Sequence, residues 1–221
     1  MKLGVWNIDC PAIKTKRSNR IAEIITEQDC DVLVLTEVNV ALQSNRYNSI
    51  FCNELPFLNK TRNYDAPSKY HQVGIYSKLP IQKIETDEPI NSVIGAVEYN
   101  NQTVKILGQV FTIKDRWAKW SSFTFKDRMQ QQLQEIEKLS NDCFIACGDY
   151  NCRHDMSYNA SAHNGLAALK QKTNFNWPTE KEDQTVQHIL HSQHFKTNYQ
   201  ILEVGKLSDH PFLLCELQTI G

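Results

Sequence analysis

The chain of 221 residues has almost no net charge, because 24 Lys and Arg residues face 25 Asp and Glu residues and leave −1 with histidine neutral. A protein that binds nucleic acid non-specifically over its whole surface has a large positive net charge, so the composition excludes that mode of binding. The sequence also lacks a run of 18 apolar residues, and we expect no membrane span. No apolar stretch of signal-peptide length precedes Asp9 and Pro11. We therefore expect a cytoplasmic protein.

The seven cysteines are odd in number and include no C-x-x-C pair, which is typical of reduced thiols in a reducing compartment. Internal repeats, low-complexity tracts and linkers rich in Pro, Gly or Ser are also missing. The apolar fraction of 41% and the charged fraction of 22% are those of ordinary globular proteins. We expect a single domain over residues 1–221 and a monomer.

Short apolar runs rich in β-branched residues are frequent, and each one predicts a strand. They occupy residues 2–8, 31–36, 73–77, 92–98, 104–111, 143–147, 185–190 and 212–217. Helical spacing of apolar residues predicts helices over 17–26 and 127–139, and the polar residues 172–184 read as a long loop. Many strands and few helices predict a mixed α/β protein in which two largely antiparallel sheets stack with helices outside.

Polar side chains gather where the predicted strands end. Four carboxylates, two amides and an imidazole do so: Asp9, Glu37, Asp149, Asp209, Asn7, Asn151 and His210. One carboxylate at a strand end is usually a helix cap or a turn residue, but four such ends together favour a functional site. Oxygen-rich sets suit Mg²⁺ or Mn²⁺, and no paired Cys or His spacing indicates zinc. The pattern predicts metal-assisted attack of water on a phosphoryl group.

Five short strings resemble, in chain order, the signature motifs of the endonuclease/exonuclease/phosphatase superfamily, to which deoxyribonuclease I and exonuclease III belong. They are W-N-I-D at 6–9, L-T-E-V at 35–38, G-I-Y-S-K-L-P-I at 74–81, G-D-Y-N at 148–151 and S-D-H-P at 208–211. Each string alone is a weak signal, but five in the correct order over nearly the whole chain are specific. The resemblance implies the α+β class, as a four-layer α/β sandwich of two mainly antiparallel β-sheets flanked by helices.

The resemblance also implies how a divalent metal, Mg²⁺ or Mn²⁺, would be held. Glu37 would bind the ion directly. Asn7, Asp9 and Asp209 would line the same ion or its water ligands.

Catalytic roles follow from the same resemblance. Asp149 would position or deprotonate the attacking water, and Asn151 would donate a hydrogen bond to the phosphate. His210 would contact the phosphate and stabilise charge in the transition state, which agrees with the ability of imidazole to titrate near neutrality.

Two positions depart from the family pattern. Gln187 stands where relatives usually have an aspartate that pairs with the histidine of S-D-H, and glutamine supplies no charge there. Residues 110–112 read V-F-T where many relatives place a catalytic His or Tyr, so a general acid is missing from that position. Both a working enzyme and a weakly active or inactive phosphate-binding pseudoenzyme are compatible with these changes.

The segment 114–128 combines five basic residues, two acidic residues and four aromatics, for a local charge of +3. Basic side chains interleaved with rings suit a strand of nucleic acid. Lys114, Arg116, Trp117 and Trp120 are therefore candidate substrate-binding residues, together with Gln187. Anchoring of the loop in the core by its aromatics is an equally good interpretation.

These observations predict a divalent-metal-dependent phosphohydrolase that cleaves phosphodiester bonds, as a nuclease acting on DNA or RNA. A phosphatase or phosphodiesterase for a small phosphate ester or a phospholipid headgroup is the alternative within the same fold, because fold does not choose the substrate.

Overall fold

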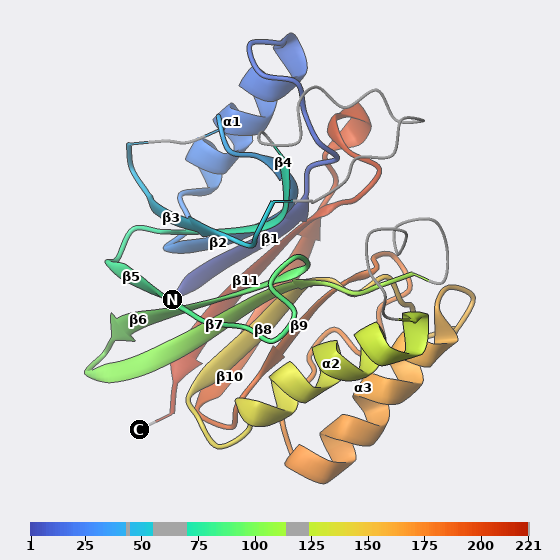
Figure 1. Ribbon diagram of the computed structural model, residues 1–221. Coiled ribbons are helices and arrows are strands. Elements are labelled where there is room, and N and C mark those ends of the chain that lie inside the picture. The colour runs from blue at the N-terminus through green and yellow to red at the C-terminus, as the bar shows by residue number, and fades with distance from the viewer. Residues whose placement is uncertain (43–44, 55–69, 114–123, 221) are drawn as a thin grey trace.

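The computed structural model describes residues 1–42, 45–54, 70–113 and 124–220 of the chain. In these residues two β-sheets stack face to face (Figure 1). The six-stranded sheet contains, in order across it, β10 (Phe195–Leu202), β11 (Phe212–Thr219), β1 (Lys2–Asn7), β2 (Val32–Asn39), β4 (Tyr70–Ser77) and β3 (Asn48–Phe51). The five-stranded sheet contains β5 (Ile81–Ile84), β6 (Ser92–Tyr99), β7 (Gln102–Val110), β8 (Phe144–Asp149) and β9 (Gln187–His191).

Each sheet has one parallel pair of strands, β1 with β2 and β7 with β8, and its other neighbouring strands run antiparallel. Parallel neighbours need a crossover connection, which α1 (Lys16–Gln28) supplies in the first sheet and α2 (Phe125–Lys138) in the second. Because parallel strands end at the same edge, the carboxyl ends of β1 and β2 lie together, as do those of β7 and β8.

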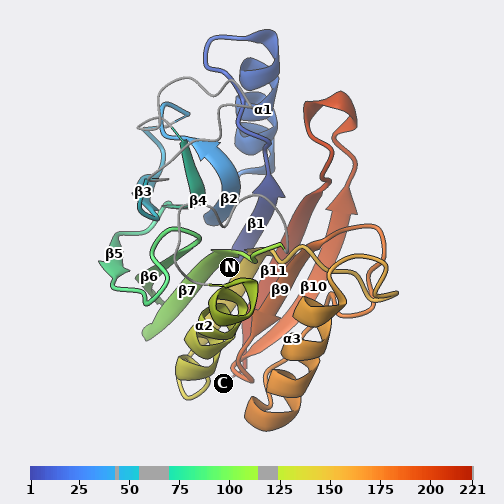
Figure 2. The same cartoon turned by 45° about the vertical axis from the view of Figure 1, so that its right-hand side comes forward.

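The helices cover the outer faces of the sheets, as Figures 1 and 2 show, with α1 on one side and α2 and α3 (Ala160–Thr173) on the other. Ile21 of α1 packs in one apolar cluster with the outer face of the six-stranded sheet. Met129 of α2 and Leu166 of α3 belong to a second cluster on the five-stranded sheet. Val34 and Ile106 belong to the cluster between the two sheets. The predicted four-layer sandwich is confirmed.

The two predicted helices begin at capping boxes. Thr15 accepts a hydrogen bond from the backbone of Ser18, whose hydroxyl accepts one from the backbone of Thr15. Thr124 and Asp127 make the same reciprocal pair at the start of α2. Each box satisfies backbone N–H groups that the first helical turn leaves without partners, which fixes where the helix starts.

The structure adds three strands and one α-helix that the sequence did not predict, besides the short 3₁₀ helix Gly205–Leu207. Strands β3 and β5 have four residues each and β10 is a partly exposed edge strand, so their apolar patterns are too short or too polar to stand out. The helix is α3, whose last residues include the start of the predicted loop 172–184. None of the described helices is long and apolar enough to cross a membrane.

Candidate functional site

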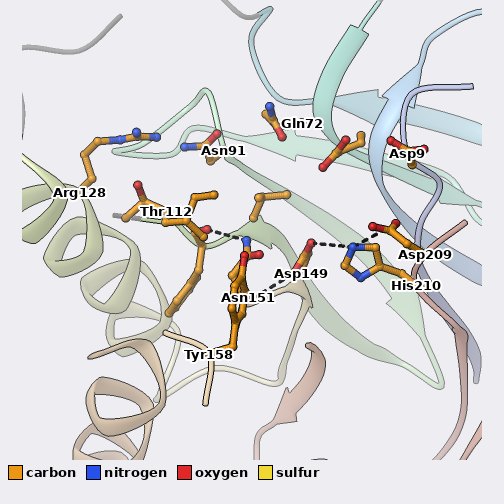
Figure 3. A pocket seen from close by; sticks show the side chains of 14 residues that line it. Asp9, Gln72, Asn91, Thr112, Arg128, Asp149, Asn151, Tyr158, Asp209 and His210 are labelled. Atoms are coloured by element: carbon orange, nitrogen blue, oxygen red, sulfur yellow. Dashed lines mark hydrogen bonds and ion pairs between the residues drawn. The ribbon is translucent and has the colours of Figure 1, made fainter. Parts of the chain in front are cut away.

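Residues from separate strand ends meet around one cavity of about 210 Å³ (Figure 3). Six of the seven predicted strand-end residues line it: Asp9, Glu37, Asp149, Asn151, Asp209 and His210. They come from the loop after β1, from β2, from the end of β8 and the loop after it, and from the loop before β11. Both sheets therefore contribute to a single site at the edge where their parallel pairs end.

Asn7, the seventh residue, is buried behind the cavity and connects its carboxylates. Its side-chain Nδ2 donates to Asp149 Oδ2 at 2.9 Å and to Glu37 Oε1 at 3.3 Å. Its Oδ1 accepts from the backbone N–H of Asp9 at 2.9 Å. One amide at the end of β1 thus fixes acidic residues from three separate segments, across the two sheets.

Glu37 sits in a strand but has a left-handed backbone, with φ 51°. The register between β2 and β4 is the same on both sides of it, where Thr36 faces Val73 and Val38 faces His71. Its carbonyl accepts from the N–H of Cys10 at 2.8 Å. A non-glycine residue held in this region costs about 1–3 kcal/mol, and such strain concentrates at functional sites. The strained backbone thus agrees with the functional role that the sequence predicts for Glu37.

The Asp149 carboxylate is the most buried acid of the cavity. Besides Asn7, the backbone N–H of Asn151 donates to it, at 3.0 Å from Oδ1. Burial raises the pKa of Asp149 above its ordinary value, while His210 and the hydrogen bonds from Asn7 and Asn151 oppose that rise. A carboxyl whose pKa is moved toward neutrality is a better proton acceptor at neutral pH than an ordinary aspartate.

Asn151 follows two residues later, also with a left-handed backbone, φ 50°. Its Nδ2 donates to the carbonyl of Phe111 at the end of β7, at 2.9 Å. A side-chain amide carries two N–H donors, so one remains for a ligand in the cavity.

His210 faces two carboxylates, with Nε2 4.0 Å from Asp149 Oδ2 and 3.5 Å from Asp209 Oδ1 (Figure 3). The S-D-H loop is tied to β1 through Ser208, whose hydroxyl donates to the carbonyl of Asn7 at 2.6 Å. Trp6 Nε1 also donates to the carbonyl of His210 at 3.0 Å. The imidazole is thus held beside Asp149 by bonds from the first strand.

Gln187 lies behind the cavity and does not line it. Its Oε1 accepts from the backbone N–H of Asn7 at 2.8 Å, and its Nε2 donates to the carbonyl of Pro211 at 2.6 Å. An ionised aspartate has no donor and could not make the second bond. Among the described contacts no hydrogen bond joins Gln187 to His210. The amide that replaces the family's aspartate is therefore a cross-link between β1, β9 and the start of β11.

Several residues of the cavity wall were not predicted as site residues. Gln72, Asn91 and Tyr158 line the cavity from elements outside the motifs, so only the folded chain brings them there. Thr112 lies in the V-F-T string and Arg128 ends the basic segment 114–128, and both signals pointed to the site without naming these two residues. A second cavity of about 340 Å³ shares Asn151, Tyr158, Asp209 and His210 with the first. The predicted substrate-binding residues Lys114, Arg116, Trp117 and Trp120 lie outside the described residues.

The chemistry of the cavity suits a hard divalent cation. Asp9, Glu37, Asp149 and Asp209 present carboxylates to one cavity, and such oxygen ligands are those that Mg²⁺ and Mn²⁺ prefer. Like charges in one site repel each other, and a cation relieves that repulsion. Within the described residues, no group of three or more His, Cys, Asp or Glu side chains is already drawn together as a finished metal site. The donor set fits the ion in chemical type.

The fold and the site define a phosphoesterase of the endonuclease/exonuclease/phosphatase type. The Endonuclease/Exonuclease/phosphatase family model matches residues 4–210, and the chain belongs to this family. Enzymes of the family generally use divalent metals. No curated protein sequence matches the chain significantly.

Three solved structures illustrate the likeness. An endonuclease/exonuclease/phosphatase from Beutenbergia cavernae DSM 12333 has a TM-score of 0.76 and 13% identity, over 100% of this chain and 72% of that one. The human Nocturnin catalytic domain with bound sulfate has a TM-score of 0.69 and 17% identity, over 100% and 93%. The 3′ phosphatase NExo from Neisseria, bound to a product DNA hairpin, has a TM-score of 0.66 and 14% identity, over 99% of both chains. At these identities the likeness shows the shared fold.

Proposed function

We propose that the protein is a divalent-metal-dependent phosphohydrolase that cleaves phosphodiester bonds in DNA or RNA. The observation that carries the proposal is the meeting of Asp149, Asn151 and His210 with the carboxylates of the same cavity. Nucleic acid as the substrate is supported by two proteins of similar fold, NExo with its product DNA hairpin and D. rerio TDP2 with a single-strand DNA product.

In this proposal Glu37 would hold Mg²⁺ or Mn²⁺ directly, and Asp9 and Asp209 would line the ion or its water ligands. When bound, the ion would polarise a phosphoryl oxygen and offset charge on the leaving group. Asn7 acts through its hydrogen bonds, because its amide keeps Glu37 and Asp149 in place.

Asp149 is the group that orients the attacking water and takes its proton. Its two oxygens are fixed by N–H donors from Asn7 and Asn151, so the carboxylate is already aimed before substrate arrives. His210 donates a hydrogen bond to a phosphate oxygen, and the remaining N–H of Asn151 donates another. These donors stabilise the negative charge that develops as the water attacks.

The test is hydrolysis of a panel of single-stranded DNA, duplex DNA with an abasic site, RNA and generic phosphate esters, with Mg²⁺, with Mn²⁺ and with chelator. We expect cleavage of at least one nucleic acid that stops when the metal is removed. Cleavage of only small esters would assign the alternative phosphatase or phosphodiesterase function. Binding of metal and nucleotide by titration calorimetry without any product would contradict hydrolysis and indicate a pseudoenzyme.

A further inference from the structure

Three buried polar side chains line the end of the cavity opposite His210 (Figure 3). Arg128, Thr112 and Asn91 are 2%, 5% and 4% exposed, and all three line the same cavity as Asp149 and His210. Figure 3 shows them on the opposite side of the cavity from His210. No step of the proposed reaction uses them. Arg128 and Asn91 both contact Glu88, at 3.6 and 3.4 Å, and all three residues keep polar groups at the cavity wall, where a ligand could reach them.

Thr112 provides the first reason to expect a ligand. Its hydroxyl oxygen is buried and has no hydrogen-bond partner among the described residues. The backbone around it is fixed, because its N–H donates to Gln132 Oε1 at 3.0 Å and its carbonyl accepts from Asn159 Nδ2 at 3.2 Å. The hydroxyl is thus held at the cavity wall with its donor and acceptor capacity unused.

Arg128 provides the second reason, since it places a guanidinium at the same wall. It lies one helical turn before Gln132 on α2, and its NH2 is 3.6 Å from Glu88 Oε1. Burial also raises the pKa of Glu88 to about 7, so at neutral pH this carboxyl carries less negative charge opposite Arg128 than an ordinary glutamate would.

Asn91 completes the group from the loop before β6. Its backbone N–H donates to Glu88 Oε2 at 2.8 Å and its carbonyl accepts from the N–H of Val110 at 2.9 Å. The residue is therefore held between the Glu88 loop and the end of β7. Its side-chain Nδ2 donates to Glu88 Oε1 at 3.4 Å, which leaves the second N–H of the amide to join the guanidinium and the hydroxyl at the cavity wall.

We propose that Arg128, Thr112 and Asn91 form a second anion subsite, which binds a further phosphate group of the substrate beside the one that is hydrolysed. A guanidinium offers a planar set of N–H donors that matches phosphate oxygens, and the hydroxyl and amide add neutral donors. The opposite end of the cavity is rich in carboxylates, so the two ends differ in charge and orient the substrate. The inference rests on the proposed function. It narrows the substrate to molecules that carry at least two phosphate groups, such as an oligonucleotide or a small bisphosphate.

The competing explanation is that Arg128 and Glu88 form only a structural ion pair in the interior. The variant Glu88→Gln separates the two explanations, because glutamine can still accept from Asn91 while the charge opposite Arg128 is removed. An anion subsite predicts that this variant binds a second phosphate more tightly than the wild type. A purely structural pair predicts no gain in binding.

The experiment measures binding of adenosine 3′,5′-bisphosphate and of adenosine 5′-monophosphate to the whole chain with Mg²⁺, by titration calorimetry. We expect the wild type to prefer the bisphosphate by about tenfold or more, the worth of one or two hydrogen bonds to a charged group. Thr112→Val should reduce this preference several-fold and Arg128→Met combined with Glu88→Gln should abolish it. The control Thr26→Val, on α1 outside the cavity, should leave it unchanged. Equal affinity for both ligands in the wild type would overturn the subsite.

Thr112→Val also guards against an effect of misfolding. Because the hydroxyl has no partner to lose among the residues that the structure describes, this variant should melt no lower than the wild type while its preference for the bisphosphate falls. A parallel fall in melting temperature and in affinity for both ligands would indicate a structural role instead.

A second arm distinguishes the source of the second phosphate. For an oligonucleotide, replacing one flanking phosphate with an uncharged methylphosphonate should lower kcat/KM for the wild type, less so for Thr112→Val, and not at all for Arg128→Met combined with Glu88→Gln. A small bisphosphate has no flanking internucleotide phosphate to replace. If the substrate is of this kind, methylphosphonates should have no effect on cleavage and only the calorimetric preference for the bisphosphate should be seen. A chain that prefers the bisphosphate but hydrolyses nothing contradicts the proposed function and not the subsite. A chain that hydrolyses the panel but lacks the preference contradicts the subsite alone.

Discussion

Some ionisable side chains of this protein are buried, and burying their charged form lowers the stability of the fold. Glu88 is the clearest case, because burial raises its pKa from 4.5 to about 7 in the folded state. A carboxyl with a raised folded-state pKa stabilises the fold fully only below its unfolded pKa. That stability is lost as the pH rises toward the folded pKa.

Replacing Glu88 with glutamine should therefore change how stability depends on pH. Near pH 4 the two proteins should have similar free energies of unfolding, and between about pH 4.5 and 7 the variant should gain on the wild type, by on the order of 2 kcal/mol. Urea unfolding at a series of pH values measures the difference. A constant difference at all pH values would show that Glu88 does not titrate in this window.

The side-chain amide of Gln187 makes a hydrogen bond that a carboxylate at this position could not make. Its amide accepts from Asn7 and donates to Pro211, and a glutamate in its place would turn the donor into a buried carboxylate oxygen facing a carbonyl. We expect Gln187→Glu to lower the free energy of unfolding by about 3–5 kcal/mol, as an uncompensated buried charge does. Gln193→Glu, on the exposed loop after β9, is the matched control. Thermal melting of the two variants compares them, and equal melting temperatures would refute the cross-link.

Among the secondary-structure elements, α1 holds together two loops of the site. The guanidinium of Arg17 donates to the carbonyls of Ile8, Asp9 and Leu207 at 2.9, 3.1 and 2.7 Å, and it pairs with Asp9 Oδ2 at 3.1 Å. The loop after β1 and the loop before S-D-H are thus joined through one side chain from the first turn of the helix.

Arg17→Met should loosen both loops and weaken metal binding. We expect the Mg²⁺ concentration for half-maximal activity to rise about tenfold or more, in the range seen when a partner of a metal ligand is removed. Arg20→Met on the same helix, whose partners Glu23 and Glu27 are exposed, should leave it unchanged. Activity titrations with Mg²⁺ on both variants measure the effect, and similar curves for the two would contradict it.

The end of β8 needs a glycine before Asp149. Gly148 has φ 143°, and a Cβ there would lie 2.0 Å from the carbonyl oxygen of Gln109 on β7. Gly148→Ala should cost about 3 kcal/mol or more because the clash is with backbone that cannot move aside. Gly205→Ala is the control, because Gly205 also has a positive φ, 62°, but an added Cβ would have no atom within 4 Å. It should lower the free energy of unfolding by about 1 kcal/mol. Denaturant unfolding gives both values, and equal costs would disprove the steric explanation.

The sequence predicted the long, buried parts of the fold because their patterns are strong. Apolar runs such as 104–111 became strands, and α1 and α2 followed their apolar spacing and caps. The motif residues at strand ends also met at one cavity, as the resemblance implied. The edge strand β10 and helix α3 were missed since their patterns are weak. Gln72, Asn91 and Tyr158 could not be placed in the site, because only tertiary packing brings them to it.

Across the entire fold, the site exists only when the two sheets are stacked. Asn7 belongs to the six-stranded sheet and Asp149 to the other, and their hydrogen bond of 2.9 Å crosses between them. Gln187 makes a second link of the same kind to Asn7. The net charge of the whole chain is close to zero, but charge is unevenly distributed in the cavity, which has carboxylates at one end and a guanidinium at the other.

Metal-dependent phosphodiester cleavage at this cavity depends, in our proposal, on Asp149 above all other residues. It is tested by the rate of Mg²⁺-dependent cleavage by the wild type, by Asp149→Asn and by the control Asp142→Asn, whose carboxylate pairs with Lys105 away from the cavity. We expect Asp149→Asn to lower kcat by about 10²- to 10⁴-fold while the control keeps its rate and both variants remain folded. A folded Asp149→Asn protein with the full metal-dependent rate would contradict this role.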